Sequence, residues 1–338
     1  MRQMPQVRIH GQNKVQLDWI DRPVAGPDDV IVQVEQCGIC GSDLGYIARG
    51  GLGADSPMPL GHELAGTVLE AGDKVRHVRV GDRVTVNPEA NGNGIGNYGP
   101  EGGFAPLLKV RGASEDEQAV MPLPEGMSFE TGALIEPLSV AMHAVHQGQA
   151  KAQDRAVIFG AGPIGLGILQ VLSYYGLKEV VVVDRSRYRL GVAESLGAVP
   201  FQADSGDLSA FLQERHGVTK LMGMPVPDSD LYFEATGAGA VFQQAVSLSK
   251  RGGRLVVVGV HKEPVQLDLV NVLIRELTIT ASMAYPDEFP RVIEMLESGK
   301  VHPQSMISHR FALQDFDEAL DTARDPESAI KVMVNCQS

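Results

Sequence analysis

The chain has 338 residues, a formal net charge of −13, and 43% hydrophobic residues. This length fits two domains of ordinary size, and the composition is typical of a globular protein. The excess of acidic residues argues against a nucleic-acid partner, because binding to a phosphate backbone needs clustered Lys and Arg.

The cysteine count and the lengths of the apolar runs indicate in which cellular compartment the protein is located. Only Cys37, Cys40 and Cys336 are present, which gives no disulfide framework. No run of 18 apolar residues occurs, and the first eleven residues are mixed and polar, so neither a membrane span nor a secretory signal is predicted. We therefore expect a cytoplasmic protein with no membrane partner.

Up to about residue 125 the pattern predicts short strands joined by turns. Residues 28–36 alternate apolar and polar side chains, which is typical of a half-buried antiparallel strand. Two further segments are predicted as strands: 64–70 and 78–86. Residues 87–103 are rich in Gly, Asn and Pro and are predicted to form a loop.

From about residue 130 the pattern changes to alternating strands and helices. The predicted strands are 155–159, 179–183, 230–233 and 254–258. The predicted helices are 129–147, 163–175, 186–196, 240–250, 287–298 and 315–323. This alternation predicts parallel βαβ units, and the continuous valine runs indicate strands that are buried on both faces.

A glycine-rich turn joins the first of these strands to its helix. Residues 160–165 read Gly-Ala-Gly-Pro-Ile-Gly, which is the pattern G-x-G-x-x-G in the strand-turn-helix context that it requires. Gly160 would allow the tight turn, Gly162 the approach of a pyrophosphate, and Gly165 the close packing of helix on sheet. Pro163 and Ile164 open the helix, whose N-terminus would bind the phosphates.

An acidic residue follows at the expected distance. Asp184 ends the next strand, 19 residues after Gly165, where a carboxylate would accept hydrogen bonds from ribose hydroxyls. A carboxylate there repels a 2′-phosphate, so NAD is favoured over NADP. Arg185 and Arg187 lie beside it and would meet a 2′-phosphate or remain solvated.

Cys37 and Cys40 form a C-x-x-C pair that allows three interpretations. A redox pair would need a thioredoxin-like context, and a structural zinc site would need a second pair of ligands. A catalytic zinc needs only Cys, His and a carboxylate on separate loops, and His62, Glu63 and Glu136 are candidates. Glu136 lies among apolar residues, where a carboxylate needs a partner, although an exposed position at a helix start fits as well.

Several motifs in order resemble one family over nearly the whole chain. The sequence resembles the medium-chain, zinc-dependent alcohol dehydrogenases, and most closely their polyol and butanediol dehydrogenase members. The motifs are CGICGSD (37–43), GHELAG (61–66), VGDRV (80–84), GGFAP (102–106), ALIEPLSVAMHA (133–144), GAGPIG (160–165), DLYFEATGA (230–238) and RGGRLVVVG (251–259).

The resemblance implies an α/β fold in two domains. A GroES-like β-rich catalytic domain would comprise residues 1–150 and 285–338, so that the C-terminal segment rejoins it. A doubly wound, parallel-sheet Rossmann domain that binds NAD would comprise residues 151–284.

The resemblance also implies roles at the metal site. Cys40 and His62 would be zinc ligands, and Glu63 or Glu136 would supply the third, directly or through water. Ser42 would hydrogen-bond the substrate oxygen and pass on its proton, while Asp43 would orient the histidine. Zinc would act as a Lewis acid, and a hydride would move from the carbinol carbon to the nicotinamide.

Other implied features concern the cofactor and the assembly. Arg189, Thr236 and Val258 fall at the family's cofactor-contacting positions, although Arg189 is equally well explained as a solvated helix residue. Family members are usually dimers or tetramers, so we expect a homodimer or homotetramer. His143 and His146 have metal-like spacing but are better explained as a packed or surface pair.

Three departures from the family pattern qualify these roles. The stretch 87–103 has none of the four cysteines that hold a structural zinc in many members, so we expect one zinc per subunit. Gly45 replaces the usual proton-relay histidine, which leaves water or Tyr46 as the route. Ala284 replaces an arginine that some polyol enzymes use, which favours a less polar secondary alcohol over a sorbitol-like substrate.

Two other functions compete with this one. A zinc-free reductase of activated double bonds would share the fold but has no need of Cys40, His62 and Glu136 together. A non-catalytic nucleotide-binding protein would share it as well, because a fold alone does not fix a function.

Overall fold

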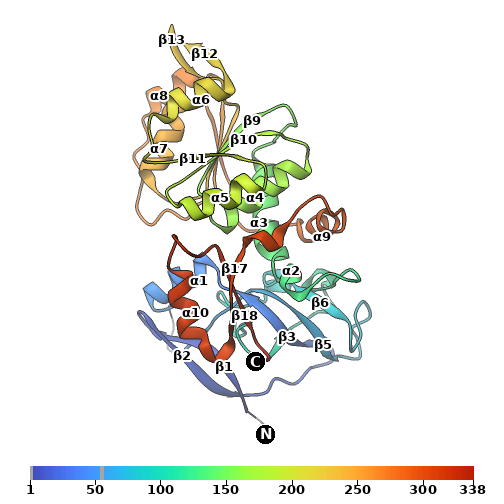
Figure 1. The fold of residues 1–338 in the computed structure, drawn as a ribbon. Helices are drawn as coiled ribbons and strands as arrows, with labels where there is room; N and C mark the ends of the chain where they lie inside the picture. The colour runs from blue at the N-terminus through green and yellow to red at the C-terminus, as the bar shows by residue number, and fades with distance from the viewer. Residues whose placement is uncertain (1–2, 54–56) are drawn as a thin grey trace. The chain divides into compact units, whose positions relative to one another are not determined.

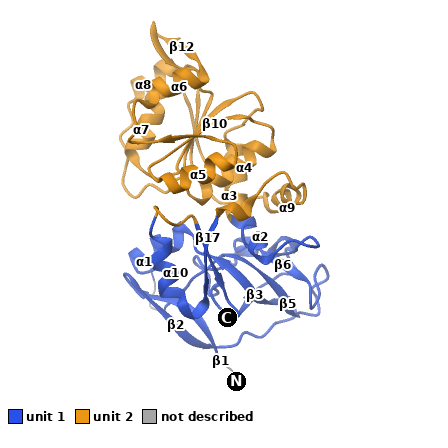
Figure 2. Ribbon diagram, viewed as in Figure 1, with its two compact units in different colours: residues 1–136, 307–325, 331–338 blue, residues 137–306, 326–330 orange. Residues whose placement is uncertain are grey.

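The computed structural model describes residues 3–53 and 57–338, which form two compact units (Figures 1 and 2). The described residues within 1–136, 307–325 and 331–338 form unit 1, and residues 137–306 and 326–330 form unit 2. Within the part of the chain that the structure describes, no helix has the length and apolarity needed to cross a membrane.

Unit 1 is built on mainly antiparallel sheets, as the alternating pattern predicts, with one parallel pair, β17 and β18. Its main sheet has the strand order β17-β18-β3-β5-β6-β8, with β7 also paired to β3, and a smaller sheet has the order β2-β1-β4. The strands are β1 (Gln3–Gly11), β2 (Lys14–Asp21), β3 (Val30–Gly38), β4 (Met58–Pro59), β5 (Glu63–Ala71), β6 (Arg83–Val86), β7 (Leu107–Val110), β8 (Val120–Pro122), β17 (Ile307–Ala312) and β18 (Lys331–Asn335). The helices are α1 (Gly41–Arg49), α2 (Phe129–Ala133) and α10 (Phe316–Ala323), with short 3-10 turns η1 (Ala90–Gly92), η2 (Glu117–Ala119) and η4 (Leu313–Asp315).

The C-terminal segment joins the sheet of the N-terminal segment. β18 pairs antiparallel with β3, so that Met333 lies opposite Gly38 and Val334 opposite Cys37. This pairing places residues near position 331 beside residues near position 38. It confirms the expectation that the chain returns to its first domain.

Unit 2 is a doubly wound sheet. Its six strands are all parallel, in the order β11-β10-β9-β14-β15-β16. The strands are β9 (Arg155–Phe159), β10 (Glu179–Asp184), β11 (Val199–Gln202), β14 (Leu231–Glu234), β15 (Arg254–Val257) and β16 (Thr278–Ala281). The order reverses between β9 and β14, where doubly wound sheets bind their ligands beyond the carboxyl ends of the strands.

Helices and a hairpin complete unit 2. The helices are α3 (Ile135–Gln147), which begins at the boundary with unit 1, α4 (Pro163–Tyr174), α5 (Arg187–Ser195), α6 (Leu208–His216), α7 (Gly239–Leu248), α8 (Leu269–Arg275), α9 (Phe289–Glu297) and the 3-10 turn η3 (Pro303–Met306). β12 (Val218–Leu221) and β13 (Met224–Pro227) form a separate hairpin. Valine and aromatic side chains of the central strands, among them Val157, Val181 and Tyr232, form the buried core.

The compact units divide the chain at residues 136 and 306, whereas the domain boundaries that we propose from the resemblance are residues 150 and 284. The reason is that α3 packs against α4 and that the segment after β16 forms a hydrogen bond with it. A Cβ on Gly167 of α4 would lie 2.9 Å from Ala141 Cβ of α3, so these two helices are in close contact. His302 N donates to Gln170 Oε1 of α4 at 2.8 Å, and these contacts draw both flanking segments into unit 2.

Two element predictions need correction. The predicted strand 78–86 is a strand only over Arg83–Val86, because residues 79–82 form a turn in which Arg79 N donates to Asp82 Oδ2 at 2.9 Å. The predicted helix 129–147 is two helices, α2 and α3, separated at Leu134. Pro137 lies in the first turn of α3, where a missing N–H does no harm, and that position suits a helix start better than a helix interior.

Candidate metal centre and dinucleotide-binding edge

Three side chains with metal-binding atoms converge in unit 1. One ligand atom each of Cys40, His62 and Glu63 lies within 4.8 Å of the other two. Cys40 precedes the first turn of α1, and His62 and Glu63 lie where the chain enters β5. His62 and Glu63 are buried, so their polar atoms need partners other than water.

The backbone before His62 is set by a glycine. Gly61 has φ +95°, and a Cβ there would lie 2.7 Å from Phe104 N and 3.0 Å from Cys37 Sγ. Both the left-handed conformation and the close contacts require glycine at this position. Gly61 thus fixes the direction in which the next residue enters the centre.

His62 lies between a carboxylate and a hydroxyl. Its Nδ1 is 3.5 Å from Asp43 Oδ1, and its Nε2 is 3.4 Å from Ser42 Oγ. Asp43 is fully buried, and its other oxygen accepts a hydrogen bond from Cys40 N at 2.9 Å. The carboxylate therefore faces the imidazole nitrogen that points away from Ser42, as an orienting acid would.

The electrostatics of this cluster favour positive charge. Burial acts to lower the pKa of His62, but the negative groups Asp43 and Cys40 raise it by more, so the pKa lies well above its ordinary value. The same negative groups would stabilise a bound cation. A thiolate, an imidazole and a carboxylate form a donor set that zinc accepts, so the residues present fit this metal.

A buried lysine that the sequence interpretation missed is bound to Glu63. Lys331 Nζ donates to the two carboxylate oxygens at 2.6 and 2.5 Å and to Ile39 O at 3.0 Å. A Cβ on Gly38 would lie 2.3 Å from Glu63 Oε2, so this glycine provides the space for the pair. Burial lowers the pKa of Lys331, yet the negative charges of Glu63, Cys40 and Glu136 raise it overall.

Glu136 lies outside the group that the other three candidates form. It is only 6% exposed, which rules out the interpretation as an exposed residue at a helix start. It does not belong to the group whose ligand atoms all lie within 4.8 Å of one another. Its charge nevertheless acts on Lys331, so both acidic candidates lie around one lysine.

Cys37 is outside the cluster as well. It is fully buried, and this burial raises its pKa well above the ordinary value. Such a thiol is uncharged and poorly reactive at neutral pH. The C-x-x-C pair is therefore split between a metal-binding candidate and a buried thiol, and no redox pair forms.

In unit 2 the glycine-rich turn has the expected geometry. Gly160 has φ +102°, and Gly162 caps the N-terminus of α4, with Pro163 and Ile164 in its first turn. A Cβ on Gly165 would lie 1.8 Å from Gly160 O, so only glycine allows the helix to start this close to the strand. The free N–H groups of the first turn lie at the carboxyl edge of the sheet.

Asp184 is tied to this turn. Its Oδ2 accepts from Ala161 N at 2.6 Å, and its Oδ1 accepts from Ser186 N at 2.8 Å. The carboxylate thus holds the glycine-rich turn beside the end of β10. It remains half-exposed, so its free lone pairs can accept further hydrogen bonds.

The other cofactor candidates lie along the same edge. A Cβ on Gly162 would lie 3.7 Å from Arg189 Nη1, while Nε and Nη2 of this arginine donate to Ala329 O at 3.0 and 2.8 Å. Arg189 is therefore anchored beside the turn. Thr236 and Val258 follow β14 and β15, and the backbone N–H groups of both donate to Glu234.

The sequence interpretation missed Glu234 and its partner. This glutamate is fully buried and accepts from Thr236 N at 2.8 Å, Gly237 N at 2.9 Å and His261 Nε2 at 2.8 Å. It links the two loops that follow β14 and β15. A glutamate at the end of a predicted buried strand was the available signal.

The pair His143 and His146 is a packed pair. Their Nδ1 atoms lie 2.9 and 3.2 Å from one oxygen of Glu288, and His146 Nε2 lies 2.9 Å from the Tyr175 hydroxyl. Among the described residues, only Cys40, His62 and Glu63 form a group of three potential metal ligands. The prediction of a packed or surface pair is confirmed.

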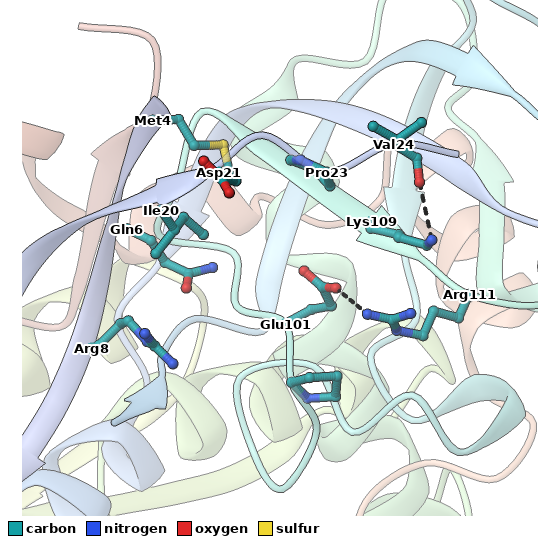
Figure 3. A pocket seen from close by; sticks show the side chains of 11 residues that line it. Met4, Gln6, Arg8, Ile20, Asp21, Pro23, Val24, Glu101, Lys109 and Arg111 are labelled. Carbon is teal, nitrogen blue, oxygen red and sulfur yellow. Dashed lines mark hydrogen bonds and ion pairs between the residues drawn. The ribbon is translucent and has the colours of Figure 1, made fainter. Parts of the chain in front are cut away.

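One cavity of unit 1 is lined by residues other than those of the candidate centre. Figure 3 shows this space of about 340 Å³, which is lined mainly by residues of β1, β2 and β7. Arg111 Nη2 donates to Glu101 Oε1 at 2.7 Å, and Lys109 Nζ donates to Val24 O at 3.0 Å across it. None of the predicted site residues lines it, so it is not the candidate active site.

Comparison with known families identifies both units. Residues 26–125 match the model of the alcohol dehydrogenase GroES-like domain, and residues 163–298 match that of the zinc-binding dehydrogenases. The fold and the site therefore define a two-domain, zinc-binding oxidoreductase with a GroES-like domain and a Rossmann domain.

Characterised relatives cover nearly the whole chain. The chain is 32% identical to (R,R)-butanediol dehydrogenase of Bacillus subtilis, over 98% of this chain and 99% of the relative. It is 33% identical to sorbitol dehydrogenase of Rattus norvegicus, over 97% and 94% of the two chains. The chain belongs to the zinc-dependent, medium-chain alcohol dehydrogenase family.

Solved structures agree with this assignment. The crystal structure of 2R,3R-butanediol dehydrogenase from Bacillus subtilis matches with a TM-score of 0.87 and 30% identity, over 98% and 99% of the chains. An Escherichia coli alcohol dehydrogenase with bound NADH matches at 0.84 with 27% identity, over 99% and 100% of the chains. A Sinorhizobium meliloti zinc-binding dehydrogenase with bound NADP matches at 0.85 with 27% identity, over 99% and 100%.

Proposed function

We propose that this enzyme uses zinc and NAD to interconvert a small secondary alcohol or polyol with the corresponding ketone. The convergence of Cys40, His62 and Glu63 is the observation that carries the proposal. The relatives named for butanediol and sorbitol support this substrate class. The two alternative functions, a zinc-free reductase and a non-catalytic nucleotide-binding protein, have no comparable support from these relatives.

Different residues of the metal centre would bind the metal, orient its ligand and transfer the proton. Zinc, when bound, supplies a Lewis acid that acidifies a substrate hydroxyl. Cys40 and His62 would hold it, and Asp43 would fix the imidazole in the orientation that binding requires. Ser42 Oγ lies 3.4 Å from His62 Nε2, where it would accept the hydroxyl proton and pass it on.

One of the two acidic candidates, Glu63 or Glu136, would supply the third zinc ligand. Glu63 belongs to the cluster, but Lys331 binds both of its carboxylate oxygens, so ligation of a metal would require it to share them. Glu136 lies outside the cluster and near the same lysine. We infer that Glu63 is the nearer ligand and that Glu136 is its water-bridged alternative.

The cofactor preference rests on Asp184. A carboxylate at the end of β10 would accept from the ribose hydroxyls and repel a 2′-phosphate, so NAD is the preferred cofactor. Arg187 Nε donates to Gln202 Oε1 at 3.0 Å, so a 2′-phosphate would have to compete for this side chain. Gly160, Gly162 and the first turn of α4 would hold the pyrophosphate.

We also propose one zinc per subunit and no structural zinc. The loop 87–103 lacks cysteine and is held by polar contacts, such as those of the Asn93 amide nitrogen with Ala90 O and Arg111 O at 2.9 and 3.0 Å. Reduced, free thiols suit a cytoplasmic location, which remains our expectation.

A homodimer or homotetramer is the proposed assembly. β16 ends the sheet of unit 2 and has only β15 as a neighbour there. Exposed apolar side chains gather in the same stretch of sequence: Val260, Leu269, Val270, Leu273 and Met283. An open sheet edge with apolar surroundings is suited to contact with a second copy of the chain.

Elemental analysis of the purified protein, together with an NADH absorbance assay on a panel of alcohols, tests the proposed function. About one zinc per chain and activity on secondary alcohols would support it. A metal-free protein that binds NAD and oxidises no alcohol would contradict it. Light scattering on the same sample gives the number of subunits.

A further inference from the structure

Two loops of unit 2 meet at the carboxyl edge of its parallel sheet. Residues 235–238 follow β14, and residues 258–261 follow β15. A Cβ on Gly259 would lie 2.1 Å from Gly237 N, and a Cβ on Gly237 would lie 2.5 Å from Val260 O, so the two backbones are in direct contact. A movement of one loop would therefore displace the other.

These loops border the part of the edge where the nicotinamide half of a dinucleotide would lie. A dinucleotide binds across the point at which the strand order reverses, which here lies between β9 and β14. Asp184 at the end of β10 is the proposed contact of the adenosine ribose, so the other half would face the loops after β14 and β15. A Cβ on Gly160 would lie 3.1 Å from Thr236 Cγ2, so the first loop lies beside the glycine-rich turn.

The side chain of Glu234 connects the two loops. This residue is fully buried, and its Oε1 accepts from Thr236 N at 2.8 Å and from Gly237 N at 2.9 Å, both in the first loop. Its Oε2 accepts from His261 Nε2 at 2.8 Å, in the second loop. Among the residues that the structure describes, His261 is the one hydrogen-bond partner of Oε2, so a single side chain completes the connection.

His261 acts on Glu234 through one nitrogen. An ionised carboxylate can only accept, so the imidazole carries a proton on Nε2. Its Nδ1 is buried and has no hydrogen-bond partner within the described part of the chain. The ring also packs edge-on against Phe242 of α7, with centroids 6.2 Å apart and planes at 83°. The contribution of His261 to the connection thus depends on a donor at the position of Nε2.

Loss of this donor would change the loops. It would leave one oxygen of a buried carboxylate without a partner, which costs free energy where water is excluded. Glu234 could regain a partner only by turning away from Thr236 and Gly237 or by admitting water between the loops. Either response alters the backbone that would face the nicotinamide half.

We propose that His261 is a positioning residue for the cofactor, which holds Glu234 so that the loops after β14 and β15 keep a single conformation around the nicotinamide half of NAD. The inference rests on the proposed cofactor and assigns to His261 a role that acts through Glu234 and needs no contact with the cofactor itself. The adenosine half should be insensitive to His261, because the proposed contacts of that half are Asp184 and the glycine-rich turn.

Two amide substitutions test this inference, because they differ only in where the amide lies. In His261→Gln the amide nitrogen can replace Nε2 and donate to Glu234, whereas in His261→Asn the shorter side chain cannot reach it. Titration calorimetry gives the affinities for NADH and for ADP, which lacks the nicotinamide nucleoside. We expect His261→Asn to weaken NADH binding about tenfold, because the loops then spend less time in the binding conformation, and to leave ADP binding unchanged. His261→Gln should retain the NADH affinity within about twofold, since the donor is kept.

His216→Gln is the matched control for a purely structural effect. His216 is a second buried histidine of unit 2, and its Nδ1 lies 2.8 Å from the hydroxyl of Ser229, which precedes the amino end of β14. This substitution removes a hydrogen bond at the opposite end of the strand that carries Glu234. It should lower the midpoint of thermal unfolding and leave the affinities for NADH and ADP unchanged.

The outcomes separate this role from the proposed function. Equal NADH affinities of His261→Asn and His261→Gln, or a parallel loss of ADP binding in His261→Asn, would overturn the role of His261. Should His261→Asn fail to fold, the double variant with Glu234→Gln removes the buried charge and should show the same selective loss. A wild-type protein that binds ADP but not NADH would instead refute the proposed cofactor, and this inference with it.

Discussion

The metal centre and the dinucleotide-binding edge are built in opposite ways. The dinucleotide-binding edge is formed by the glycine-rich turn 160–165 and the end of β10. Its contacts are made mainly by backbone groups and glycines, and they include a hydrogen bond between Asp184 and Ala161, which are 23 residues apart. At the centre, buried charged side chains meet from distant parts of the chain. Lys331 and Glu63 are 268 residues apart.

This difference decides how each region should respond to substitution. A glycine-rich turn fails when atoms are added, because the helix N-terminus must approach the strand closely. A buried charge cluster fails when atoms are removed, because the remaining charges lose their partners. Damage to one region should leave the other largely intact, since the two lie in separate compact units.

The largest effect is expected for His62→Ala at the centre. Removing the imidazole takes away a proposed zinc ligand and the group that Asp43 and Ser42 face. We expect turnover to fall by about a thousandfold or more, with a loss of bound zinc. NADH affinity, measured by fluorescence titration, should change less than twofold because the edge lies in the other unit.

Cys40→Ser is the companion variant, since it replaces a soft ligand by a weak one without removing much volume. The same separation of turnover from NADH affinity is expected. Full turnover in both variants would remove the zinc assignment. Loss of NADH binding in either would show that the centre and the edge are more strongly coupled than their construction implies.

The sequence was sufficient for the edge because its signals are local. Valine runs predicted the central strands, the glycines predicted the turn, and the strand that follows ended at Asp184. A hydrophobic strand buried on both faces has few alternatives. The sequence predicted four of the six strands, β9, β10, β14 and β15, but neither β11 nor β16, which are the two outer strands of the sheet.

The centre could be predicted only in part. Cys40, His62 and Glu63 were candidates by residue type and resemblance, and the structure brings these three together. Lys331 gave no signal, because a lone lysine in a terminal strand is ordinarily solvated. Its burial depends on the β18–β3 pairing, which no local pattern contains.

The same limit explains the elements of unit 1 that went unpredicted. β2 has mostly exposed side chains, so its alternation is weak, and it is stabilised by pairing with β1. α1 contains two glycines, which disfavour a helix. It forms because Asp43 binds the backbone of Cys40 and because Ile47 is buried.

An intermediate effect is expected for Lys331→Met. The substitution leaves Glu63 as a buried carboxylate without its cation, which typically lowers the free energy of unfolding by about 3–5 kcal/mol. Circular dichroism can follow urea unfolding of the protein, and the shift of the unfolding midpoint measures the loss of stability.

Two further variants make this measurement decisive. Lys74→Met removes an exposed lysine that is paired with Asp28 at 3.0 Å and should lower the stability far less, because solvent screens an exposed pair. Adding Glu63→Gln to Lys331→Met should recover part of the loss, since the side chain that loses its cation is then uncharged. Equal effects of the two lysine substitutions would mean that the buried pair contributes no more than a surface one.

The smallest effect is expected for Gly165→Ala at the edge, where one methyl group is added. Its Cβ would lie 1.8 Å from Gly160 O, so the turn or the helix must move. The strain should lower stability by about 1–3 kcal/mol and weaken NADH binding about tenfold, with zinc content unchanged.

Gly191→Ala is the matched control, because that glycine also lies within a helix, α5, but its added Cβ would have no atom within 4 Å. It should raise stability by about 0.5–1 kcal/mol through helix propensity and leave NADH affinity unchanged. If both alanines gave the same result, close approach of backbone at the glycine-rich turn would not be what makes the edge sensitive to added atoms.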